Sequence, residues 1–349
     1  MPVMWLMLRS GLAEVSEYLS AHVLTCLVPA FFIAGGIAAL VSTGAVLKFF
    51  GPTTKKYLSY GVASVSGTVL AVCSCTVLPL FGGIYKRGAG LGPAITFLYS
   101  GPAINLLAIV LTARAIGLSM GVARGTGAIG LSIIIGLVMA AAFRREEVAR
   151  VTKESVFGTD AMSRSPWLHL AFFGTLVAIL LVGTSKAPGW GKVAVIISLA
   201  NTLVLIASRW LAPEEVKTWL AETAKLAKQI FPVLLIGVFV AGMIKAVLPP
   251  EWVVAYVGAN TLAANLLAAV AGALMYFSTL TEVPIIKALT DLGMAKGPAL
   301  ALLLSGPAVS LPNMLVVGRF MGARKTALYV GLVVGFATLL GLFYGAIAG

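Results

Sequence analysis

The chain has 349 residues, of which 60% are apolar and 11% charged, and its mean hydropathy is +1.02. Soluble domains carry about a quarter charged residues, so this composition excludes a soluble protein and predicts an all-α polytopic membrane protein. The net charge of +13 does not indicate nucleic-acid binding, because the lysines and arginines lie singly or in pairs between apolar runs, as they do at the edges of membrane spans.

Apolar segments long enough to cross the hydrocarbon core, which takes about 20 residues, recur along the whole chain. The second and the eighth are too long for one straight crossing, and each contains a proline, Pro79 or Pro284. We expect each of these two to be a broken helix or a span followed by a re-entrant segment. About 8–10 transmembrane helices are therefore expected, within residues 22–47, 57–86, 91–113, 121–143, 167–185, 191–210, 229–248, 252–290, 297–318 and 325–348.

Two polar stretches interrupt the apolar segments. The connection 144–165 is rich in arginine and lysine, which places it on the cytoplasmic side. Residues 213–228 begin with a proline and two glutamates and end with lysines. This pattern predicts an amphipathic helix that lies at the membrane interface before the seventh span.

The chain contains an internal repeat. Residues 73–117 align without a gap with residues 278–322, at an offset of 205, and 14 of the 45 positions are identical. The identities gather on glycine and proline, which shared hydrophobicity does not explain. We predict a first transmembrane repeat at 1–143, a cytoplasmic loop with two linker spans at 144–212, and a second repeat at 213–349. An even number of spans between the halves favours a parallel orientation, whereas one re-entrant hairpin in place of a crossing would invert it.

The repeat places Ser-Gly-Pro-Ala in each half, at residues 100–103 and 305–308. Proline removes a helical hydrogen bond and glycine adds backbone freedom. In hydrocarbon, such breaks persist only when they are buried in protein or line a wet cavity, where the free N–H groups of a half-helix can bind a polar or anionic substrate. We predict a substrate site where the two breaks meet, with a simple packing kink as the alternative. The predicted helix-breaking residues are Pro79, Gly101, Pro102, Pro284, Gly306 and Pro307.

Small thiol and hydroxyl residues precede Pro79 and Pro284 in the two halves. Cys73 and Cys75 could bind a soft centre such as trivalent arsenic, could cycle through a strained disulfide, or could pack as small apolar residues. The asparagines after the breaks could line a cavity or hydrogen-bond another helix. The predicted substrate-binding residues are Cys73, Cys75, Thr76, Ser100, Asn105, Thr279, Thr281, Glu282, Ser305 and Asn313.

Glu282 is a carboxylate inside an apolar run. Ionisable groups at membrane depth usually face the protein interior or water and have a function. Because burial disfavours the charged form of a carboxyl group, Glu282 is a candidate proton carrier. The alternative is a structural ion pair with a lysine or arginine such as Lys287. No nucleotide-binding, hydrolase or zinc-protease motif is present, so we expect no enzyme activity, no catalytic residue, no cofactor and no metal site.

The run from Cys73 to Asn105 and the matching run from Ser278 to Asn313 resemble the ArsP/YraQ-type predicted permeases. The resemblance covers both repeats and rests on polar, glycine and proline positions. It implies a membrane permease. One branch of the family exports trivalent organoarsenicals, which makes Cys73 and Cys75 attractive as ligands.

These observations predict a multi-pass secondary transporter of the plasma membrane. It would move a small solute that is thiol-reactive or contains sulfur or arsenic, and the resemblance suggests efflux. The rival interpretation is a membrane thiol–disulfide oxidoreductase that uses Cys73 and Cys75 with a soluble thioredoxin-like partner. The expected partners are the lipid bilayer and the solute, with a homodimer as a further option and no nucleic acid.

Overall fold

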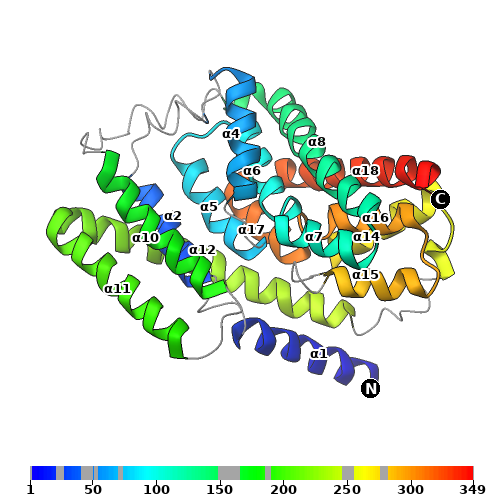
Figure 1. Ribbon diagram of the computed structural model, residues 1–349, viewed down its shortest axis with the longest axis horizontal. Coiled ribbons are helices and arrows are strands. Elements are labelled where there is room, and N and C mark those ends of the chain that lie inside the picture. Colours follow the sequence, from blue (N-terminus) through cyan, green and yellow to red (C-terminus); the bar gives the residue numbers. More distant parts are fainter. Residues whose placement is uncertain are drawn as a thin grey trace.

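The computed structural model describes residues 2–20, 27–40, 50, 54–69, 74–147, 166–184, 190–245, 255–275 and 282–348. Within these ranges the chain is helical and contains no strand, as the ribbon in Figure 1 shows. This confirms the all-α class.

Four of the described helices are long and apolar enough to cross a membrane: α8 (Leu118–Ala142), α11 (Trp190–Trp210), α12 (Pro213–Lys245) and α18 (Ala323–Ala348). A bent pair, α6 (Leu91–Ala103) followed by α7 (Leu106–Ala115), would make a fifth span with a bend of 44°. The chain is therefore a polytopic membrane protein. The larger number of 8–10 crossings stays a prediction, because the other apolar stretches of the described helices, Val28–Leu40, Leu170–Gly183, Leu262–Leu274 and Lys296–Ser305, have only 10–17 residues.

Both overlong apolar segments are divided into two helices. Residues 57–86 form α4 (Lys56–Val69) and α5 (Ser74–Lys86), and residues 252–290 include α14 (Leu262–Leu274) and α15 (Glu282–Asp291). The prediction of a broken segment is confirmed for 252–290, because α14 ends at its C-cap Met275, whose backbone is extended. Residues 70–73, between α4 and α5, lie outside the described residues. Neither proline ends its helix. Pro284 lies in the first turn of α15, where a missing N–H costs no helical hydrogen bond, and α5 continues through Pro79.

The two Ser-Gly-Pro-Ala motifs interrupt the chain differently. In the second half, α16 (Lys296–Ser305) ends directly before Gly306 and Pro307, and α17 (Leu311–Met321) follows. In the first half, α6 continues through Gly101 and Pro102 and ends at Ala103. The expected break at Gly101 and Pro102 thus lies just after these residues, at Ile104 and Asn105.

The N-terminal helix and the linker helices pack around α12. Helix α1 (Pro2–Tyr18) runs along the end of α12, where Ser10 Oγ donates to the Gly242 carbonyl at 2.9 Å. Helix α2 (Val28–Leu40) and the pair α10 (Pro166–Thr184) and α11 lie at the opposite end of the molecule from α14–α16 and the C-terminus (Figure 1). The prediction of a separate interfacial helix at 213–228 is wrong. These residues are the first part of the continuous helix α12, which runs on through Pro232 into its apolar turns.

Corresponding helices in the two halves begin at a constant interval. The starts of α6, α7 and α8 at 91, 106 and 118 are followed by those of α16, α17 and α18 at 296, 311 and 323, and each difference is 205. The contacts correspond as well: α6 packs on α4 and α8 while α16 packs on α14 and α18, and α5 contacts α17 while α15 contacts α7. This is the arrangement that the predicted repeat requires. The homology of the halves and the division at 143 and 213 stay predictions.

Glycine pairs allow the backbones of these helices to approach closely. A Cβ atom on Gly136 of α8 would lie 2.8 Å from the Gly92 carbonyl oxygen of α6. A Cβ atom on Gly341 of α18 would lie 2.7 Å from the Gly297 carbonyl oxygen of α16. Helices in membranes commonly associate through such small residues, so one glycine pair supports the corresponding crossing in each half.

Candidate functional site

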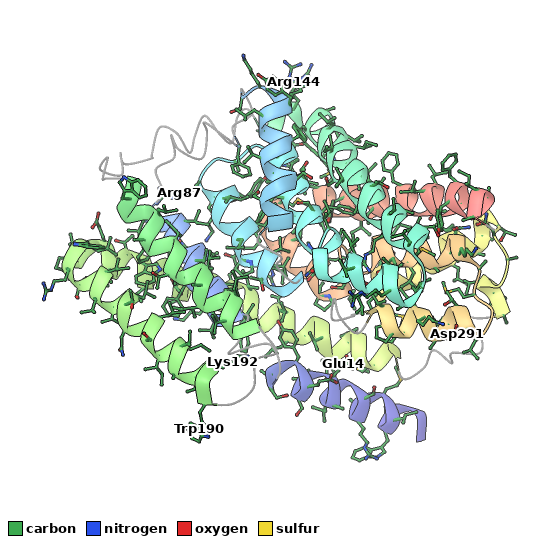
Figure 2. The ribbon with its side chains drawn as sticks, in the orientation of Figure 1. Glu14, Arg87, Arg144, Trp190, Lys192 and Asp291 are labelled. Atoms are coloured by element: carbon green, nitrogen blue, oxygen red, sulfur yellow. The ribbon has the colours of Figure 1, made fainter. Side chains whose placement is uncertain are left out.

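A fully buried ion pair joins helices α8 and α15, which lie far apart in the sequence. The Nη2 atom of Arg124 in α8 donates to Oε2 of Glu282, the first residue of α15, at 3.0 Å. Both side chains have an exposed fraction of 0%. By contrast, the charged side chains of Arg144 and Asp291 are exposed and lie at the edge of the molecule (Figure 2).

Arg124 is also held by helix α7. Its Nη1 atom donates to Thr112 Oγ1 at 3.0 Å, and the Thr112 hydroxyl donates to the Ala108 carbonyl at 2.7 Å. The guanidinium group therefore links α7, α8 and α15. Because two of its three nitrogens are fixed by these contacts, the head group has a defined position between the helices.

One nitrogen of Arg124 and one oxygen of Glu282 remain without a hydrogen-bond partner among the described residues. These atoms are Nε of Arg124 and Oε1 of Glu282. Arginine–carboxylate pairs often form two parallel hydrogen bonds, and here one nitrogen binds one oxygen. A buried donor and a buried acceptor thus remain available at the same site.

Arg124 was not predicted, and the suggested partner Lys287 was wrong. Lys287 instead binds the carboxylate of Asp291 one turn further along α15, at the exposed end of that helix. The available signal was an arginine in the apolar run that forms α8. Because Arg124 lies near the start of that run, it resembled the charges that are common at the edges of membrane spans.

Two tyrosines hydrogen-bond the backbone around the break in the second half. Tyr99 of α6 donates to the Leu304 carbonyl at 3.0 Å, and Tyr329 of α18 donates to the Ala308 carbonyl at 3.3 Å. The last carbonyl groups of a helix have no helical partner, and α16 ends at Ser305. The tyrosine hydroxyls supply the partners that hydrocarbon cannot, so they stabilise the break.

Replacing Tyr99 or Tyr329 with phenylalanine is expected to lower the free energy of unfolding by about 1–3 kcal/mol, because each change leaves a buried carbonyl unpaired. Tyr256→Phe is the control, since Tyr256 is 67% exposed. The measurement is the unfolding of the purified protein in detergent. A loss for Tyr99→Phe no larger than for Tyr256→Phe would show that the break does not depend on this hydrogen bond.

The predicted asparagines lie at the starts of the helices that follow the two breaks. Asn105 is positioned as the N-cap of α7, where its Oδ1 accepts a hydrogen bond from the Ala108 N–H at 3.4 Å, as N-cap residues do. Ser310, the N-cap of α17, makes no such bond. Ser310 Oγ and Asn313 Oδ1 are both buried without a hydrogen-bond partner among the described residues. The start of α17 therefore has buried polar groups available for a ligand. At the start of α7, Asn105 instead caps its own helix.

Both predicted serines are buried and hydrogen-bonded to backbone carbonyls. Ser100 Oγ donates to the Phe97 and Ala63 carbonyls at 3.2 and 3.3 Å, and Ser305 Oγ donates to the Leu302 carbonyl at 3.3 Å. Both residues have an exposed fraction of 0%, and Thr76 is likewise buried. Ser305 thus bonds its own helix α16, whereas Ser100 also reaches the backbone of α4.

The thiol part of the predicted site is not described. Cys73, Thr279 and Thr281 lie outside the described residues, and Cys75 is described only as part of the first turn of α5. The position of the cysteines relative to Arg124 and Glu282 therefore stays a prediction, and nothing in the described residues favours a thiol–disulfide exchange activity.

The family model of the predicted permeases named ArsP_1 matches residues 10–346. The chain belongs to this permease family. It is 45% identical over 346 residues to UPF0718 protein MJ0584 of Methanocaldococcus jannaschii, an alignment that covers 95% of this chain and 94% of the relative. It is 23% identical over 331 residues to UPF0718 protein YraQ of Escherichia coli, with 89% and 78% covered. No solved structure matches the chain.

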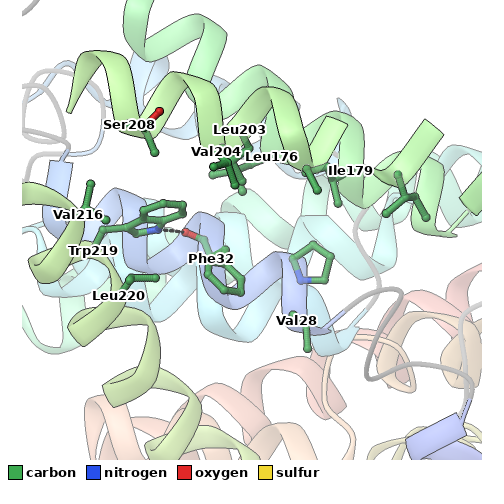
Figure 3. Close-up of a pocket in the computed structure, with 14 residues that line it drawn as sticks. Val28, Phe32, Leu176, Ile179, Leu203, Val204, Ser208, Val216, Trp219 and Leu220 are labelled. Carbon is green, nitrogen blue, oxygen red and sulfur yellow. Dashed lines mark hydrogen bonds between the residues drawn. The ribbon is translucent and has the colours of Figure 1, made fainter. Parts of the chain in front are cut away.

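This permease also has an apolar pocket away from the predicted site residues. A cavity of about 600 Å³ lies between α2, α10, α11 and α12 (Figure 3). The indole N–H of Trp219 at its wall already donates to the Phe32 carbonyl at 2.8 Å. Of the predicted substrate-binding residues that the structure describes, none lines this cavity, and its apolar surface does not suit a polar solute.

Proposed function

We propose that this permease is a secondary transporter of the plasma membrane, with its site at the Arg124–Glu282 pair and the nearby helix breaks. The observation that carries the proposal is a fully buried ion pair in a membrane protein, located where a half-helix begins. Charged residues at membrane depth are costly, and they usually mark substrate pathways or proton relays.

The way in which the pair connects the helices supports this proposal. Glu282 begins α15 in the predicted second half, whereas Arg124 and Thr112 belong to the predicted first half. Transporters built from repeats commonly bind substrate and coupling ions between the repeats, at discontinuous helices. The constant spacing of helices α6–α8 and α16–α18 supports the repeat, and the ion pair would then be a contact that changes as the halves move.

Glu282 is the proposed proton carrier, and the cysteines are proposed solute ligands. A carboxyl group at 0% exposure can exist neutral or, beside Arg124, charged, which is what a proton carrier requires. The assignment of Cys73 and Cys75 as ligands of a thiol-reactive solute rests on soft-ligand chemistry and on the family resemblance.

Glu282→Gln is expected to abolish proton-coupled flux in reconstituted vesicles, because glutamine cannot bind or release the proton. Proton uptake is measured while organoarsenicals, sulfur compounds and oxyanions are added one at a time, with equal amounts of folded protein. Lys287→Gln is the matched control, since Lys287 lies on the same helix in an exposed ion pair. The double variant Cys73→Ser/Cys75→Ser tests the thiols. Unchanged proton dependence in Glu282→Gln would disprove the coupling role.

A further inference from the structure

The charge of Arg124 constrains what can accompany a proton at Glu282. A guanidinium group stays protonated in proteins, so the positive charge of Arg124 is permanent. Thr112, its other partner, is neutral. The neighbouring cations Arg114 of α7 and Lys296 of α16 are exposed, and Lys287 is paired with Asp291 at the far end of α15. Among the described residues, Glu282 is therefore the group that compensates Arg124.

Protonation of Glu282 alone would leave the buried guanidinium without a counter-charge. Removing one partner of a buried ion pair is strongly unfavourable. A neutral solute does not supply the missing charge, and a cationic solute adds a second positive charge. An anion that replaces the carboxylate at Arg124 restores neutrality. Proton binding and anion binding at this site must then occur together.

We propose that the substrate is a small anion, an oxyanion or a carboxylate, that takes the place of Glu282 at Arg124 when Glu282 binds a proton. This proposal rests on the proposed proton-coupled transport and names its substrate class. One proton and one anion bind on one side of the membrane, and both leave on the other. The carboxylate of Glu282 then returns to Arg124, so that no net charge crosses the membrane.

The hydrogen-bonding groups of the site fit this exchange. Arg124 Nε is a buried donor without a partner among the described residues, and it can bind an anion together with Nη2 in the two-point manner of guanidinium groups. A protonated Glu282 could in addition donate a hydrogen bond to the bound anion.

The first experiment measures anion binding by the full-length protein in detergent. The shift in melting temperature is recorded with sodium formate, sulfate or thiosulfate, against sodium gluconate at equal ionic strength. For the wild type, the apparent Kd of at least one probe should rise about tenfold per pH unit where Glu282 is charged, because one proton binds with one anion. Glu282→Gln mimics the protonated state, so its binding should be tighter and independent of pH.

Two further variants separate this role from a structural one. Arg124→Gln/Glu282→Gln removes both charges and should bind none of the probes, whereas Lys287→Gln should behave as the wild type does. The proposal is overturned if Glu282→Gln binds none of the three probes, or if its binding keeps the wild-type pH dependence. If Glu282→Gln does not fold, two other results decide the proposal. They are the pH dependence of anion binding by the wild type and the loss of anion binding in Arg124→Gln/Glu282→Gln.

A flux measurement distinguishes this proposal from the proposed function. In vesicles containing the wild type, proton uptake driven by the anion should not change when a potassium diffusion potential is imposed, because the exchange carries no net charge. Proton uptake that is coupled to a neutral solute would overturn the anion proposal and leave the proton-coupled transporter standing. Anion binding by Glu282→Gln together with flux independent of Glu282 would overturn the coupling role instead.

Discussion

Arg124→Gln is expected to lower the free energy of unfolding by about 3–5 kcal/mol at neutral pH, because it leaves the carboxylate of Glu282 buried without its partner. The loss should shrink in acid. The folded variant then gains a proton on Glu282, and a folded state that binds more protons than the unfolded state becomes more stable as the pH falls. Chemical unfolding in detergent at acidic, neutral and alkaline pH measures this effect.

A double-mutant cycle of Arg124→Gln and Glu282→Gln measures the interaction between the two side chains. Glu282→Gln should be destabilised to a similar extent without relief in acid, since arginine cannot lose its proton. Arg124→Gln/Glu282→Gln should be close to the wild type, because removing a buried pair together is often neutral. Losses that simply add in the double variant would show that the two side chains do not interact, contrary to their 3.0 Å contact.

Gly136→Val is expected to disrupt the crossing of α6 and α8. Its Cβ atom would lie 2.8 Å from the Gly92 carbonyl oxygen and 2.2 Å from Thr96 Oγ1, and backbone atoms cannot move aside without displacing a helix. Overpacking of this kind costs about 1–3 kcal/mol and occasionally more. The unfolding transition in detergent and the yield of folded protein measure the loss.

The same helix provides the control. Gly130 in α8 has no atom within 4 Å of its added Cβ, so Gly130→Val should leave stability nearly unchanged. In the second half, Gly341→Val and its control Gly335→Val should repeat the contrast, because Gly341 meets Gly297 as Gly136 meets Gly92. A tolerated Gly341→Val would argue against equivalent crossings in the two halves.

Much of the fold follows from local sequence properties. Hydropathy locates the apolar helices because each span needs a run of apolar residues wherever it lies in the molecule. The two Ser-Gly-Pro-Ala motifs locate helix ends to within a few residues, because the effect of glycine and proline on the backbone is local, whereas α5 runs through Pro79. The amphipathic character of 213–228 was visible too, but only the structure showed that these turns continue directly into the apolar part of α12.

The sequence by itself determined that the chain is an all-α membrane protein with interrupted helices and that Glu282 is an unusual buried carboxylate. Only the tertiary structure decided what compensates Glu282. Its partner Arg124 lies 158 residues earlier, and the nearer cation Lys287 faces an exposed aspartate instead. The physical reason is that hydropathy and backbone preferences act over a few residues, whereas a buried charge is paired by whichever helix the packing of the whole bundle brings to it.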